Sequence, residues 1–133
     1  MKKIDIACII DDDPIYVYGA KRALELGEIC HSILIYHDGK EAFDKLSQII
    51  KSNQKLPDLI LLDINMPVWD GWQFLDEFVK IPIKQKITIF MVSSSIDPSD
   101  TERAKTYEAV SDFIIKPITI DKLRNMLMHV SNN

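Results

Sequence analysis

Five short apolar runs alternate along the chain with segments whose apolar residues recur at helical spacing. Strands that alternate with helices are typical of a parallel sheet covered by helices on both faces, because each crossover returns the chain to the same end of the sheet. The sequence therefore predicts a doubly wound α/β fold. The runs interpreted as strands are Ile4–Ile10, His31–Tyr36, Leu59–Leu62, Ile87–Val92 and Asp112–Ile115.

Capping signals mark the starts of the helices between these runs. Asp13 followed by Pro14 combines a favoured N-cap with a proline at the first helical position. The pair predicts a helix to about Leu26, with Gly27 as its stop. The other helices are expected to begin at Asp38-Gly39, Asp70-Gly71, Asp97-Pro98 and Thr119-Ile120, with the third ending at Pro82 and the last near His129.

The length and the charge narrow the class of protein. A chain of 133 residues suits one domain, and we expect a single domain over residues 1–133 with no output domain. Met1-Lys2-Lys3 shows no signal-peptide pattern and no apolar run is long enough to span a bilayer, so a cytoplasmic protein is expected. The net charge of -4 argues against a nucleic-acid surface. Cys8 and Cys30 are interpreted as reduced thiols, with a disulfide left open.

Asp63 ends a strand that is apolar enough to be buried on both faces. The residues after it, including Pro67 and Asp70-Gly71, cannot continue a strand and predict a loop. Ligands of open parallel sheets bind at the carboxyl ends of the strands, so a carboxylate at this place is positioned for chemistry. The alternative is that Asp63 only ends the strand and caps the next helix.

Polar residues also follow three other predicted strands. Asp11 and Asp12 follow the first, Ser93 follows the fourth, and Lys116 follows the fifth. Each has an ordinary interpretation as a turn or surface residue, but their joint spacing favours one shared crevice. Neighbouring carboxylates there would suit Mg²⁺ (or Mn²⁺), with Lys116 supplying further positive charge.

This set of motifs resembles the receiver domain of two-component response regulators, in its single-domain form like the chemotaxis regulators. The resemblance covers essentially the whole chain and implies a flavodoxin-like (βα)5 sheet with strand order 2-1-3-4-5. It also implies a cis bond between Lys116 and Pro117. The motifs that carry it are Ile9–Pro14, Asp58–Pro67, Asp70-Gly71, Met91–Ser94 and Phe113–Pro117.

The resemblance assigns a role to each candidate site residue. Asp63 would be the phosphoacceptor, and Asp11, Asp12, Asp63 and the backbone carbonyl of Asn65 would hold the metal. Lys116 would pair with the phosphoryl group.

The resemblance also implies a switch at the fourth and fifth strands. Ser93 would bind a phosphoryl oxygen and move inward, and Phe113 would follow it between exposed and buried states. The partner-facing surface would then be built from the fourth helix, the fifth strand and the fifth helix. Trp69 departs from the usual methionine and is expected to pack against the third helix.

The partners implied are a sensor histidine kinase or a histidine phosphotransfer protein, and a downstream protein, with no nucleic acid and no membrane. The chain would catalyse only its own phosphorylation and slow dephosphorylation. A phosphatase of the haloacid dehalogenase type is the enzymatic hypothesis, but it needs a second acid where this chain has Asn65. Two further hypotheses are a binding module that signals without phosphorylation and a fragment of a longer regulator.

Overall fold

The structure is a computed structural model that describes residues 3–95 and 97–131. Met1 and Lys2, which the sequence analysis used to exclude a signal-peptide pattern, fall outside those residues. Among the residues described, no helix combines the length and the apolar character needed to cross a bilayer.

The described chain forms one parallel sheet of five strands in the order β2-β1-β3-β4-β5. This confirms the strand order that the resemblance implies. Two strands begin earlier than their apolar runs, β2 by one residue and β5 by two. The strands are β1 (Ile4–Ile10), β2 (Cys30–Tyr36), β3 (Leu59–Asp63), β4 (Thr88–Ser93) and β5 (Val110–Ile115).

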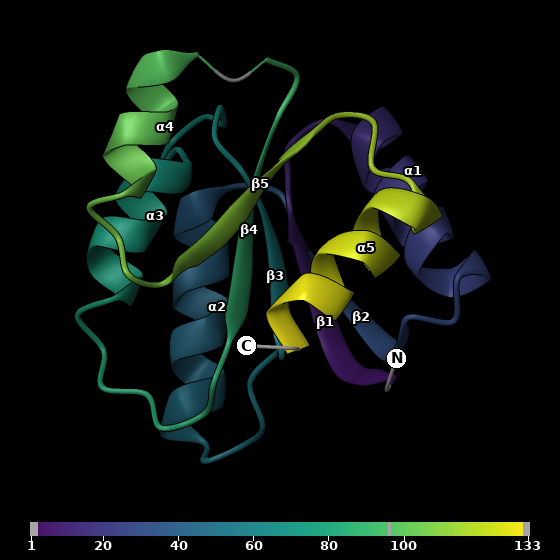
Figure 1. Cartoon of the computed structure of the whole chain (residues 1–133). Helices are drawn as coiled ribbons and strands as arrows, with labels where there is room; N and C mark the ends of the chain where they lie inside the picture. Colours follow the sequence, from purple (N-terminus) through teal and green to yellow (C-terminus); the bar gives the residue numbers. More distant parts are fainter. Residues whose placement is uncertain (1–2, 96, 132–133) are drawn as a thin grey trace.

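Helices cover both faces of the sheet, α1 and α5 on one face and α2, α3 and α4 on the other (Figure 1). Strand residues alternate between the two apolar clusters beneath these helices, as the pleat of a strand requires. All five residues of β3 are buried because it lies at the centre of the sheet. The helices are α1 (Pro14–Leu26), α2 (Gly39–Lys51), α3 (Gly71–Phe78), α4 (Pro98–Ala104) and α5 (Ile120–Ser131).

The predicted caps are present. An aspartate side chain accepts a backbone N–H at the start of each of the first four helices, from Asp13, Asp38, Asp70 and Asp97. The Thr119 hydroxyl accepts the N–H of Lys122 at 3.2 Å, at the start of α5. The predicted end of α3 at Pro82 is wrong, because the helix stops at Phe78 with Val79 as its C-cap.

The loop between β3 and α3 packs closely against its neighbours. The Gly39 N–H donates to the Trp69 carbonyl at 3.1 Å. The Trp69 ring, expected against the third helix, lies edge-on to Phe43 of α2 with their centroids 5.4 Å apart. At the other end of the loop, a Cβ on Gly71 would lie 2.6 Å from the Asp63 carbonyl oxygen. The loop that follows Asp63 is therefore fixed by two glycine contacts.

We predict that Gly71→Ala destabilises the protein by roughly 2 kcal/mol, since a methyl group there must displace the backbone of β3. Gly19→Ala is the matched control, because nothing lies within 4 Å of its added Cβ inside α1. That substitution should stabilise by about 0.5–1 kcal/mol through helix propensity. Urea unfolding of the two variants measures both values, and equal effects would contradict the close contact at Gly71.

Candidate functional site

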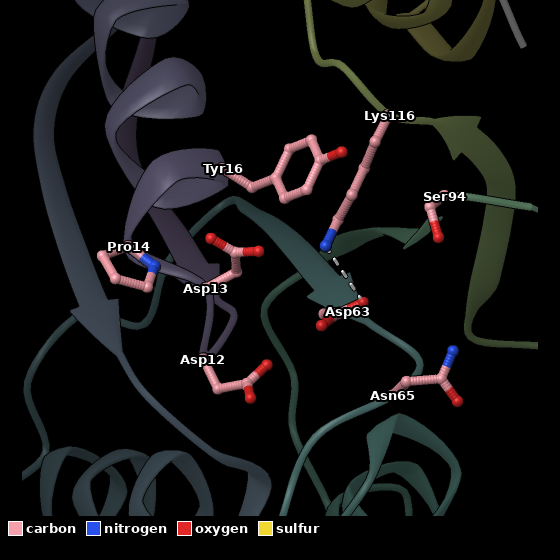
Figure 2. A pocket seen from close by; sticks show the side chains of 8 residues that line it. All are labelled: Asp12, Asp13, Pro14, Tyr16, Asp63, Asn65, Ser94 and Lys116. Atoms are coloured by element: carbon pink, nitrogen blue, oxygen red, sulfur yellow. Dashed lines mark ion pairs between the residues drawn. The ribbon is translucent and has the colours of Figure 1, made fainter.

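A crevice opens at the carboxyl ends of the central strands (Figure 2). Its walls come from the start of α1, the end of β3 and the loops after β4 and β5. Residues that are far apart in sequence meet there because parallel neighbouring strands end at the same edge of the sheet. The residues that line it are Asp12, Asp13, Pro14, Tyr16, Asp63, Asn65, Ser94 and Lys116.

Three acids meet at the floor of this crevice. Asp11, Asp12 and Asp63 each offer a carboxylate oxygen, and these atoms lie within 4.8 Å of one another. The register of the sheet brings two of them together. Ile10 of β1 pairs with Leu62 of β3, and the next residue in each segment is an acid, Asp11 or Asp63. Asp11 and Asp63 are buried, whereas Asp12 is exposed. Such a set of carboxylate oxygens can hold a hard divalent cation.

Among the described residues, Lys116 is the one whose ammonium group contacts these acids. Its Nζ lies 3.0 Å from Asp11 and 3.5 Å from Asp63, and its side chain is 7% exposed. The Lys116 N–H donates to the Ser93 carbonyl at 2.8 Å, which fixes the backbone at the start of this loop. The Lys116–Pro117 bond is cis, as predicted.

The charges shift the pKa values of both partners. Burial, followed by the charge of Asp11, raises the pKa of Asp63 from 3.8 to about 7, although the charge of Lys116 lowers it. Burial alone would lower the pKa of Lys116, but its contacts with Asp11 and Asp63 raise that pKa above its usual value. One lysine therefore does not neutralise the three acids.

The other three predicted residues, Asn65, Ser93 and Phe113, differ in their exposure and in their contacts. Asn65 is exposed and lines the crevice. Ser93 is buried, and its hydroxyl donates to the Ser95 carbonyl at 2.7 Å. Phe113 is half-buried on β5 and packs against the cluster under α2, α3 and α4.

Sequence reasoning placed Asp13 and Pro14 only at the start of a helix, and it missed two other residues of the crevice wall, Ser94 and Tyr16. The run Ser93-Ser94-Ser95 held a signal for the first, since any of the three hydroxyls lies at or just after the end of β4. Tyr16 lies in the first turn of α1, three residues after the N-cap Asp13, and no signal in the sequence marked it as part of the crevice.

A flavodoxin-like sheet with acids and a lysine at its carboxyl edge defines the class to which this protein belongs. The model of the response regulator receiver domain matches residues 7–128. The chain therefore belongs to the family of receiver domains of two-component response regulators, whose members are signalling switches and not metabolic enzymes.

Similar proteins come from several lineages. A two-component response regulator from Cytophaga hutchinsonii is 31% identical with a TM-score of 0.89, and the match covers 99% of this chain and 100% of that one. The probable methanogenesis regulatory protein FilR2 of Methanothrix harundinacea is 25% identical over 94% of this chain and 80% of its own length. The response regulator ARR12 of Arabidopsis thaliana is 28% identical over 65% of this chain, which spans 14% of its length.

We predict that Asp63→Asn raises the melting temperature in EDTA at pH 7.5 by on the order of 5 °C. The folded-state pKa of Asp63, about 7, lies above the ordinary value of 3.8. Its bound proton therefore contributes stability that is fully present below pH 3.8 and is lost as the pH rises through 7. The variant should flatten this loss between pH 5 and pH 7.5.

Thermal unfolding of both proteins across this pH window measures the slope. Asp44→Asn is the control, because Asp44 is an exposed acid on α2 that pairs only with Lys40 among the interactions described. It should leave the slope unchanged. Parallel slopes for wild type and Asp63→Asn would contradict a raised pKa at Asp63.

Proposed function

We propose that the protein is a phosphorylatable switch of a two-component system or phosphorelay, with Asp63 as the phosphoacceptor. The observation that carries this proposal is a buried carboxylate at the end of β3, which has an ammonium 3.5 Å away and two further acids beside it. The donor is a phosphohistidine on a sensor histidine kinase or on a histidine phosphotransfer protein.

The donor set fits a magnesium or manganese ion. Asp11, Asp12 and Asp63 offer hard oxygen atoms, and burial together with the charge of Asp11 raises the pKa of Asp63 although Lys116 lowers it. These three side chains and the backbone carbonyl of Asn65 would hold the ion. A bound divalent ion supplies positive charge that screens the acids and the incoming phosphoryl oxygens.

The chain's own residues have distinct tasks in the transfer. A carboxylate oxygen of Asp63 forms a bond to phosphorus, the bond from phosphorus to the donor's imidazole nitrogen breaks, and the imidazole leaves with the electron pair. Lys116 neutralises a phosphoryl oxygen, and positioning with charge stabilisation supplies most of the catalysis. Later attack of water on phosphorus releases phosphate and restores the carboxylate. The protein catalyses only these reactions on itself.

Ser93 links the site to the outer surface. In this structure its hydroxyl donates a hydrogen bond to the Ser95 carbonyl. After phosphorylation the hydroxyl turns to the phosphoryl group, and the end of β4 moves inward with it. β5 pairs with this strand, with Ser93 beside Ile115 and Met91 beside Phe113. Phe113 then moves from its half-buried place, and the surface of α4, β5 and α5 changes as a shift between two populations.

The changed surface binds a downstream protein, or the phosphoryl group passes onward to another protein. We infer that residues 1–133 act as one receiver domain in the cytoplasm, where the free thiols of Cys8 and Cys30 are stable. A dehalogenase-type phosphatase has its second acid at the place of Asn65, and an amide cannot serve as a general acid, which supports a switch over a turnover enzyme.

We predict that acetyl phosphate with Mg²⁺ adds the mass of one phosphoryl group to the wild type, at Asp63. Asp63→Ala should remove the added mass completely, and EDTA should prevent it in the wild type. Intact-mass measurement followed by peptide mapping tests the assignment. Asp13→Ala is the matched control, because Asp13 lines the same crevice but caps α1. Labelling of Asp63→Ala at another carboxylate would show that the assignment is wrong.

We predict that beryllium fluoride with Mg²⁺, a phosphoryl mimic, changes hydrogen exchange most in α4, β5 and α5. The reason is the coupling of Ser93 to Phe113 through the paired strands. Hydrogen-exchange mass spectrometry with and without the mimic measures this, with Asp63→Asn as the variant that should not respond. Changes confined to α1 and α2 would count against this surface.

A further inference from the structure

The amine of Lys116 has a neighbour of a different kind besides the two carboxylates. It lies 4.2 Å from the centre of the Tyr16 ring. Figure 2 shows the ring and the lysine chain side by side, with the amine directed to Asp63. Tyr16 is neither a metal ligand nor the phosphoacceptor in the proposed mechanism, so that mechanism does not explain the contact between its ring and Lys116.

We propose that Tyr16 is a positioning residue for Lys116. The face of its ring holds the ammonium beside Asp63 and so raises the rate at which Asp63 takes up a phosphoryl group. This inference rests on the proposed function and adds a residue to the machinery of that same site.

The physical basis is the attraction between a cation and the negative face of an aromatic ring. The attraction is stronger where water is excluded, and the Lys116 side chain is only 7% exposed. A lysine stem is flexible, and its ammonium has no fixed direction of its own. A contact that narrows the range of amine positions therefore places the charge before the donor arrives.

An aromatic ring suits this crevice better than another acid. Three carboxylates already meet at its floor. A further carboxylate near Lys116 would hold the amine, but it would also repel the negative phosphoryl group. The Tyr16 ring attracts the ammonium and adds no net charge to the site.

The position of Tyr16 on α1 separates it from an ordinary core residue. It lies one turn before Ala20, which is buried with Ala23 and Leu24 under the helix. Tyr16 itself is only half-buried and forms part of the crevice wall with Lys116. Tyr18, two residues further, is 66% exposed and is absent from that wall, which makes it a matched control.

The first measurement is the rate of labelling by acetyl phosphate with saturating Mg²⁺. Tyr16→Leu should slow labelling about fivefold, the size of a partly desolvated cation–π contact. Tyr16→Phe keeps the ring and should restore a rate near wild type, and Tyr18→Leu should leave it unchanged. The affinity for Mg²⁺, followed by tryptophan fluorescence, should be the same in all four proteins, whereas general damage to the fold would change it.

A double-mutant cycle tests whether the effect passes through the lysine. In a Lys116→Met background, Tyr16→Leu should cause no further loss of rate. An equal fivefold loss in both backgrounds, or no loss in the single variant, overturns the positioning role.

The contact itself is measured without any phosphoryl donor. The ε-methylene signals of Lys116 should show a ring-current shift in wild type and Tyr16→Phe, and Tyr16→Leu should remove it. If Asp63 is labelled but this shift is missing, the inference about Tyr16 fails alone. If the shift is present but Asp63 is never labelled, the proposed function fails, and the rate effect assigned to Tyr16 is overturned with it.

Discussion

The site depends on an imbalance of charge in which three carboxylates face one ammonium group. Asp11, Asp12 and Asp63 lie within 4.8 Å of one another, and Lys116 contacts two of them. Two like charges about 4 Å apart repel by roughly 4 kcal/mol at an effective dielectric near 20, so the buried pair Asp11 and Asp63 opposes folding of the metal-free site, whereas solvent screens the exposed Asp12. The rest of the structure must hold these groups together against that repulsion.

The central strand supplies most of this restraint. β3 is buried along its whole length, with two apolar clusters packed on its opposite faces. The loop after Asp63 is fixed in turn by the close approaches at Gly39 and Gly71. A carboxylate on such a strand cannot move away from its neighbours without disturbing the centre of the sheet. Stability lost at a functional site is a common cost of function.

The apolar runs predicted the α/β fold and placed Asp11, Asp12, Asp63 and Lys116 at the ends of strands, whereas the strand order that brings them together came from the family resemblance. The sequence did not predict the start of β5 at Val110, since the exposed polar residue Ser111 interrupts the apolar pattern of this strand at the sheet edge. The end of α3 at Phe78 and the packing of Trp69 on α2 were also missed. These details depend on contacts between distant segments, as does the approach of Tyr16 to Lys116, and no local pattern records them.

The sheet order has a consequence for how the chain is made. β1 and β3 are neighbours in the sheet and carry all three acids at their ends, whereas Lys116 arrives only with β5 at the far edge. During synthesis from the N-terminus, the acids therefore emerge well before the ammonium group that partly neutralises them. A nascent chain, or any fragment that stops before β5, holds the whole acidic set without the counter-charge of Lys116. The last strand thus completes the electrostatics of a site whose other parts were made first.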